Sequence, residues 1–177
     1  MQYEERPNYD PDAVKPMRAE LTGAGFVELL TAEDVDGALK ENRASEDQTA
    51  LFMLNSVCGC AAGSARPGVT LALQNKIIPD KLFSAFAGME KAAVRRLREA
   101  LEPNLPSSPA MALFKNGELV EMIHRHNIEN HSAQEVAAHL VEVFNHKCSA
   151  EGPSIPREKY NKLVSPDICG STLELMD

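Results

Sequence analysis

The feature that most constrains the fold is the run TALFMLN at residues 49–55, in which Thr49 and Asn55 bound five consecutive apolar residues. The run lacks the apolar–polar alternation of a half-exposed strand. A continuous apolar run is typical of a strand that is buried on both faces of a parallel or mixed sheet. Helices must then cover both faces of that sheet, so the sequence predicts the α/β class.

The other predicted elements complete an alternating pattern around this strand. We expect helices over 12–22, from Thr31 onward, from the turn after 49–55 to about 75 with a kink at Pro67, over 89–101, and from Ser132 onward. We expect strands over 26–30, 81–87, 110–114 and 118–123, the last two joined by the hairpin pair Asn116-Gly117. This order, a βαβ half followed by a ββα half, resembles the thioredoxin architecture: a central mixed β-sheet flanked by helices, with an N-terminal helix and an irregular C-terminal tail.

Composition excludes several classes of function. Acidic side chains outnumber basic ones 26 to 18, and the net charge of −8 argues against a nucleic-acid partner. No apolar run is long enough to span a bilayer and no leader pattern opens the chain, so we expect a cytoplasmic protein without a membrane partner. Four cysteines are too few for a secreted disulfide scaffold, and a close pair in a reducing compartment indicates catalysis or metal binding.

The close pair is Cys58-Gly59-Cys60, which directly follows the buried strand. We expect Cys58 at the start of a helix, where backbone N–H groups and the helix dipole favour a thiolate over a thiol. The thiolate is the nucleophile of disulfide exchange, and helix N-termini lower the pKa of cysteine. Cys58 is therefore the predicted nucleophile, accessible and with a lowered pKa.

The one-residue spacing assigns the second cysteine a different role. Gly59 can adopt backbone angles that other residues avoid, which would bring the two thiols close enough to form a disulfide. Such a ring is strained and easily reduced, which suits transient exchange, so Cys60 is a candidate resolving cysteine or an idle one. Two alternatives stay open: a pair of buried small side chains, or a metal or cluster site completed by Cys148, Cys169 or a histidine.

Four residues outside the pair are weaker candidates. Pro109 precedes a predicted strand, and a cis bond there would hold backbone close to the thiols, whereas an ordinary loop proline is the alternative. His124 and His126 are candidates for a proton shuttle, with solvated strand-end residues as the favoured interpretation. Arg66 is a candidate for attracting an anionic thiol ligand, and we expect instead a surface or helix-packing role. Cys148 and Cys169 are expected to share no catalytic role.

The residues around the pair form a longer motif, NSVCGCAAG at 55–63 with ARP at 65–67. Further segments accompany it: PMR at 16–18 through GF at 25–26, FAG at 86–88, SSP at 107–109 leading to Leu113, and RH at 125–126 followed by IE at 128–129. Together they closely resemble the bacilliredoxin family over roughly residues 12–148. The resemblance divides the chain into a thioredoxin-like domain at 1–148 and a C-terminal extension at 149–177.

The resemblance implies that the protein removes bacillithiol from S-bacillithiolated client proteins after oxidative stress. Cys58 matches the family's attacking cysteine, and free bacillithiol or Cys60 would release the adduct. No nucleotide, flavin or metal motif is visible, so we expect no cofactor. The resemblance implies bacillithiol as the thiol co-substrate. A general protein disulfide isomerase or reductase is the enzyme alternative, and a metal- or cluster-binding module is the alternative from another class.

Overall fold

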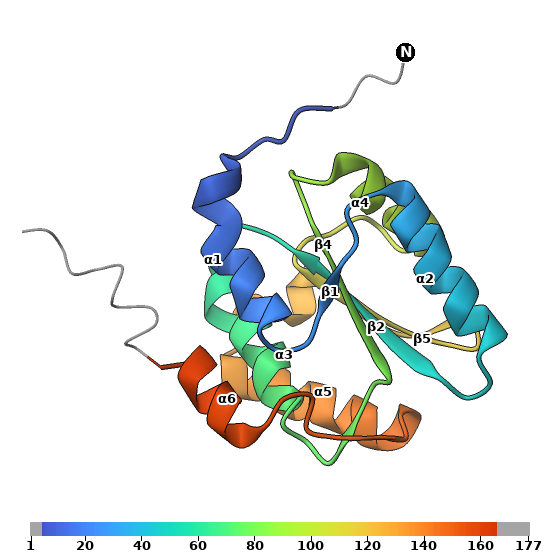
Figure 1. The fold of residues 1–177 in the computed structure, drawn as a ribbon, viewed down its shortest axis with the longest axis vertical. Helices are drawn as coiled ribbons and strands as arrows, with labels where there is room; N and C mark the ends of the chain where they lie inside the picture. The colour runs from blue at the N-terminus through green and yellow to red at the C-terminus, as the bar shows by residue number, and fades with distance from the viewer. Residues whose placement is uncertain (1–4, 166–177) are drawn as a thin grey trace, which may run out of the picture.

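A five-stranded sheet forms the centre of the molecule in the computed structural model, which describes residues 5–165 (Figure 1). The strands lie in the order β1 (Val27–Glu28), β4 (Lys81–Phe86), β2 (Thr49–Asn55), β5 (Ala110–Lys115) and β6 (Glu118–Ile123). The first three run parallel to one another, whereas β5 is antiparallel to β2 and β6 is antiparallel to β5. The predicted α/β class with a thioredoxin-like mixed sheet is confirmed.

Helices cover both faces of this sheet, as Figure 1 shows. One face packs against α2 (Ala32–Ala44) and α4 (Lys91–Ala100), and the other against α1 (Pro11–Thr22), α3 (Arg66–Ala72) and α5 (Ala133–Lys147). All seven residues of β2 are buried, with Leu51 and Met53 in the core under α3 and α5, and Phe52 in the core under α2 and α4. Because successive strand side chains point to opposite faces, this one apolar run fills both cores.

Local sequence signals fix the ends of several elements. Thr31 and Asp34 form the capping box of α2, in which each side chain accepts a hydrogen bond from the other residue's backbone N–H. Ser132 opens α5 with the same type of box. Asn116 and Gly117 have φ values of 53° and 79°, the left-handed conformation that a tight hairpin requires. These predictions are confirmed.

Two predicted elements differ from the structure in extent. The strand predicted over 26–30 is reduced to β1. The helix after the cysteines begins with a π-helical segment, η1 (Ala61–Ala65), continues as α3 and ends near Ala72 rather than near residue 75. Pro67 lies in the first turn of α3, where the missing N–H of proline removes few helical hydrogen bonds. In place of the predicted kink at Pro67, the helix has a π turn just before the proline.

The described part of the C-terminal extension forms regular elements that sequence periodicity did not reveal. Strand β7 (Ala150–Glu151) pairs with β3 (Ile77–Ile78), and α6 (Arg157–Leu163) follows. The Ser154 hydroxyl donates to the backbone oxygen of Ala24 at 2.7 Å, so the extension is joined to the main core. The domain boundary at residue 148 stays a prediction.

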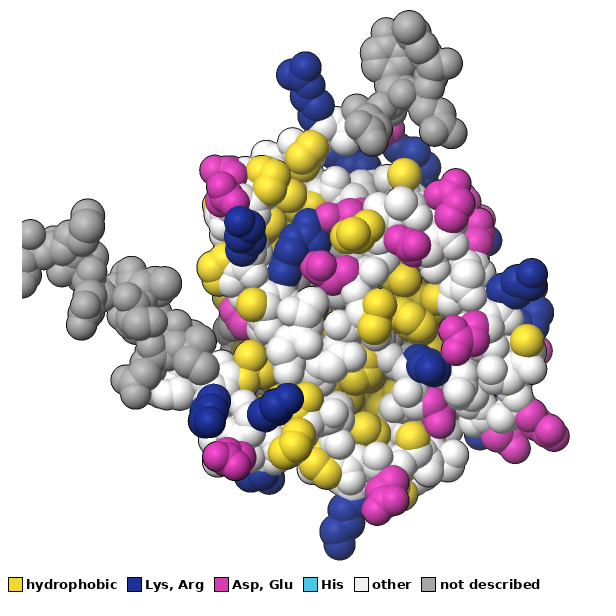
Figure 2. Space-filling view, viewed as in Figure 1, with side chains coloured by type: hydrophobic (Ala, Val, Ile, Leu, Met, Phe, Trp, Pro, Cys, Tyr) yellow, Lys and Arg dark blue, Asp and Glu magenta, His cyan; other side chains and the backbone are white. Residues whose placement is uncertain are grey.

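The molecular surface carries both signs of charge. On the face shown in Figure 2, Lys and Arg side chains are interspersed with Asp and Glu side chains rather than gathered by sign. Of the helices that the structure describes, none has the length and apolarity needed to cross a membrane.

Candidate active site

The cysteine pair lies at the carboxyl end of β2. The strand ends at Asn55, a short bend follows over 56–58, and helical structure begins at Gly59. The backbone oxygen of Cys58 accepts hydrogen bonds from the N–H groups of Ala61 and Ala62 at 3.1 and 3.2 Å. Cys58 therefore sits at the predicted strand-to-helix junction, where the first amides of the helix converge.

Cys58 makes contacts that Cys60 lacks. The Ser56 hydroxyl donates to Sγ of Cys58 at 3.0 Å, and the same oxygen accepts from the N–H of Cys58 at 3.4 Å. The two sulfur atoms lie 3.2 Å apart as free thiols, and both residues are half-buried. The pair is thus accessible, and only its first member receives a hydroxyl hydrogen bond.

These contacts shift the two thiols in opposite directions. Burial raises the pKa of Cys58, but hydrogen bonds from Ser56, Cys60 and the Ala61 N–H, together with the charge of Arg125, lower that pKa below its ordinary value. Burial, the hydrogen bond to Cys58 and the charge of Cys58 raise the pKa of Cys60 above its ordinary value. A proton shared by the pair therefore resides on Cys60, and the thiolate on Cys58.

Arg125 belongs to the RH segment of the family resemblance, and it is a site residue to which the sequence assigned no role. It begins the short helix η2 (Arg125–Asn127) after β6, and its charge lowers the pKa of both cysteines. Its guanidinium donates to Glu129 at 3.2 Å and to the backbone oxygen of Ser108 at 3.3 Å. The family resemblance includes this arginine, but its residue pattern does not indicate that the charge lies close to the thiols.

Of the two roles expected for Arg66, at the surface or in helix packing, the structure supports helix packing. Its side chain is only 2% exposed and lies beneath the segment that carries the cysteines. It donates to the backbone oxygen of Ser56 at 2.8 Å, to Oδ1 of Asn55 at 3.0 Å and to Glu20 at 2.8 Å. The π turn and α3 direct this side chain inward, so it packs between helices and is not exposed beside the thiols.

Comparison with known proteins agrees with this geometry. A family model described as "Disulphide isomerase" matches residues 9–148. A protein named Bacilliredoxin from Cytophaga hutchinsonii is 47% identical over 137 residues, which is 77% of this chain and 98% of that protein. A bacilliredoxin from Staphylococcus aureus is 46% identical over 140 residues, covering 79% of this chain and 93% of its own length.

The chain belongs to the bacilliredoxin family. As a bacilliredoxin it is a thiol–disulfide oxidoreductase. Solved thioredoxin structures are also similar: those of Fasciola hepatica and Arabidopsis thaliana thioredoxin O2 each cover 68% of the chain, at 20% and 15% identity and TM-scores of 0.44 and 0.46. The fold assignment rests on the sheet topology rather than on these distant likenesses.

The other predicted site residues of this bacilliredoxin are placed as follows. The Ser108–Pro109 bond is cis, and Pro109 directly precedes Ala110, which pairs with Leu54 near the end of β2. The proline thus lies at the same end of the sheet as the cysteines. In this thiol form Gly59 is outside the left-handed region, and an added Cβ would meet nothing within 4 Å. Its role in closing a Cys58–Cys60 disulfide stays a prediction.

His124 and His126 stack on each other with ring centroids 5.2 Å apart, next to Arg125. His126 is exposed and His124 is half-buried. Among residues 5–165, neither ring forms a hydrogen bond with the thiols. The favoured interpretation as residues at a strand end is consistent with this placement.

Cys148 lies at the opposite end of the sheet from the pair. Burial raises its pKa, and its sulfur contacts Thr49, the first residue of β2, whereas Cys58 follows the last. A seven-residue strand spans roughly 20 Å, which prevents direct exchange between these thiols. Cys169 lies outside the described residues, and within residues 5–165 no three metal-ligating side chains gather into one site.

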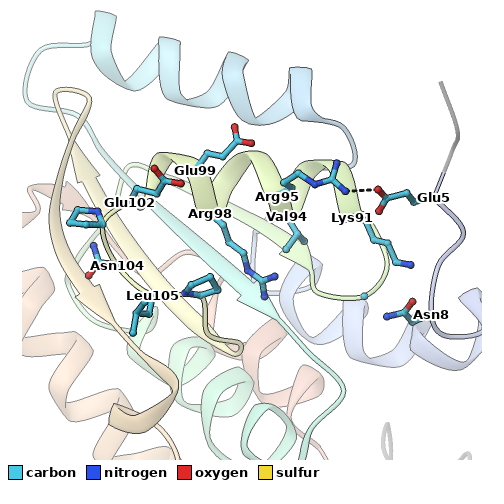
Figure 3. Close-up of a pocket in the computed structure, with 13 residues that line it drawn as sticks. Glu5, Asn8, Lys91, Val94, Arg95, Arg98, Glu99, Glu102, Asn104 and Leu105 are labelled. Carbon is cyan, nitrogen blue, oxygen red and sulfur yellow. Dashed lines mark hydrogen bonds and ion pairs between the residues drawn. The ribbon is translucent and has the colours of Figure 1, made fainter. Parts of the chain in front are cut away.

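A pocket of about 880 Å³ lies between α4 and the loop that leads to Pro109 (Figure 3). Lys91, Arg95 and Arg98 extend into it from α4, and Arg95 pairs with Glu5. Neither cysteine lines this pocket. The thiol pair instead occupies the open surface at the end of the sheet.

Proposed function

We propose that this bacilliredoxin removes bacillithiol from S-bacillithiolated proteins, with Cys58 as the attacking cysteine. The observation that carries the proposal is the unequal pair of thiols: Ser56 donates a hydrogen bond to Cys58, whose pKa is lowered, while the pKa of Cys60 is raised. A lowered pKa increases the fraction of Cys58 present as thiolate at a given pH, and the thiolate is the form that attacks disulfides.

The first step exchanges one disulfide for another. The Cys58 thiolate attacks the bacillithiol sulfur of the mixed disulfide, the client cysteine leaves as a thiolate, and bacillithiol remains on Cys58 as a new mixed disulfide. No net oxidation or reduction occurs in this step. The positive charge of Arg125 near both sulfurs favours the approach and retention of an anionic thiol.

The second step regenerates the enzyme by one of two routes. A free bacillithiol thiolate attacks the adduct, releasing bacillithiol disulfide and the Cys58 thiolate. Alternatively, Cys60 loses its proton and attacks Cys58, releasing bacillithiol and leaving a Cys58–Cys60 disulfide that an external thiol reductant must reduce. The 3.2 Å separation of the sulfur atoms supports the second route, and the raised pKa of Cys60 slows it.

We place this reaction in the cytoplasm, with S-thiolated client proteins and a low-molecular-weight thiol as partners and no bound cofactor. A sparse set of cysteines with one close pair fits a reducing compartment. The proline loop beside the cysteines offers backbone near the thiols, where an extended client segment would lie.

The test uses intact mass spectrometry of the reduced wild type, Cys58→Ser and Cys60→Ser after incubation with a bacillithiolated protein. We expect Cys60→Ser to accumulate one bacillithiol adduct and Cys58→Ser to accumulate none. A client that carries only an intramolecular disulfide distinguishes the two enzyme hypotheses. A general reductase or isomerase would process this client as well as the bacillithiolated one, whereas the proposed enzyme would not. Absence of any adduct, or stoichiometric zinc or iron in the purified protein, would refute the proposal.

A further inference from the structure

Both backbone polar groups of Ser56 are held by side chains. Its N–H donates to Oδ1 of Asn55 at 2.9 Å, and its carbonyl oxygen accepts from Nη1 of Arg66 at 2.8 Å. Holding both groups fixes the direction of the Cα–Cβ bond of Ser56, and from that position the hydroxyl lies 3.0 Å from Sγ of Cys58. The placement of Ser56 beside the thiol is therefore set from beneath the active site.

The holding residues are themselves anchored in the core. Arg66 also donates to Oδ1 of Asn55 at 3.0 Å and, through Nε, to Glu20 of α1 at 2.8 Å. Asn55 donates to the backbone oxygen of Met17, also in α1, at 3.2 Å. A buried guanidinium is costly unless its N–H groups are paired, and here the pairs link α1, α3 and the end of β2.

We propose that Arg66 is a positioning residue that, through Asn55 and the Ser56 backbone, holds the Ser56 hydroxyl against Sγ of Cys58 and thereby makes Cys58 rather than Cys60 the attacking cysteine. The inference rests on the proposed function only in taking Cys58 as the attacker. Arg66 does not touch the reacting sulfur, and it acts entirely through Ser56.

The asymmetry of the pair supports this assignment. The charge of Arg125 lowers the pKa of both cysteines, whereas their mutual hydrogen bond and the Ala61 N–H favour the thiolate on Cys58. The Ser56 hydroxyl adds a side-chain contact that a substitution can remove. The Ser56 hydroxyl contacts only Cys58. A hydrogen bond to the charged sulfur favours the thiolate, and its removal should raise the pKa of Cys58 by roughly one unit, a tenfold loss of thiolate at lower pH.

The test measures iodoacetamide alkylation of each cysteine against pH, resolved by peptide mass, in the full chain. We expect Ser56→Ala to raise the midpoint for Cys58 by about one unit, and Ser56→Thr, which keeps a hydroxyl, to restore most of it. Arg66→Lys keeps the charge but loses the Nη1 hydrogen bonds to Asn55 and to the Ser56 carbonyl oxygen, and it should raise the alkylation midpoint of Cys58. Glu20→Gln, which leaves the Nη1 contacts intact, is the matched control and should change it little.

The double variant Ser56→Ala/Arg66→Lys separates positioning from general loosening of the structure. If Arg66 acts through Ser56, its substitution adds no further shift once the hydroxyl is gone. An additional shift of similar size, or an unchanged midpoint in Ser56→Ala, would overturn the inference. If Arg66→Lys does not fold, Asn55→Ala replaces it in the same cycle. The assay contains no bacillithiol, so it can fail while the proposed function holds, and the reverse.

Discussion

Gly68 provides a quantitative test of how tightly the helix behind the cysteines is packed. It lies in α3, where that helix meets α5. A Cβ added at Gly68 would lie 2.7 and 2.8 Å from two carbon atoms of Val136 and 3.1 Å from the backbone oxygen of Ala133. Favourable carbon–carbon contacts require about 3.5–4.0 Å, so the two helices would have to separate by roughly 1 Å.

The expected change in the free energy of unfolding of Gly68→Ala is the sum of two opposing contributions. Overpacking of this kind costs about 1–3 kcal/mol. Alanine is favoured over glycine inside a helix by roughly 0.5–1 kcal/mol, which offsets part of that cost. Gly68→Ala should therefore lose about 0.5–2 kcal/mol of unfolding free energy. Gly37→Ala in α2 supplies the control, because an added Cβ there meets nothing within 4 Å and only the helix gain remains.

Urea denaturation of both variants checks the reasoning, with the m-value unchanged so that the midpoint reports stability. The difference between the variants isolates the packing term, and about 2 kcal/mol corresponds to roughly 4–8 °C in Tm for a chain of this size. If Gly68→Ala proves at least as stable as the wild type while Gly37→Ala gains as expected, the close approach of α3 and α5 is not a constraint.

Three further predictions concern the thiols and the extension. Because the pKa of Cys58 is lowered and that of Cys60 is raised, alkylation of Cys58 should rise at lower pH than that of Cys60; coincident profiles would contradict the assignment. Arg125→Gln should raise the pKa of both thiols by removing a positive charge, whereas Arg95→Gln, on an exposed arginine paired with Glu5, should leave both profiles unchanged. Gly152→Ala places a Cβ 2.0 Å from a backbone oxygen and should cost about 1–3 kcal/mol in thermal or urea unfolding, without moving the alkylation profiles.

The sheet and the place of the cysteine pair could be predicted because they depend on local signals. The apolar run at 49–55, the two capping boxes and the Asn116-Gly117 turn each act within a few residues, so their physical meaning is readable without tertiary structure. The short pairing of β3 with β7 was not predicted, because two-residue strands carry no measurable period.

The contacts that distinguish the two thiols could not be predicted for a different reason. Arg125 reaches the site from the strand end more than sixty residues away, and Arg66 turns inward only because of the structure before it. A charged residue in a helical segment is usually solvated, so burial of Arg66 contradicts the ordinary expectation. The contact of Ser56 with Cys58 could have been predicted, because a hydroxyl two residues before a reactive cysteine is a local signal.

The π-helical segment η1 makes the spacing between the cysteines and α3 a fixed quantity. Each residue of an α-helix advances the chain by about 100° around the helix axis, so one residue inserted between η1 and Arg66 would rotate Arg66 by about that angle. The guanidinium would then leave the core, and the Ser56 carbonyl oxygen would lose its partner. Substitutions that leave η1 the same length keep this alignment, whereas a single-residue insertion before Arg66 separates the redox pair from its buried anchor.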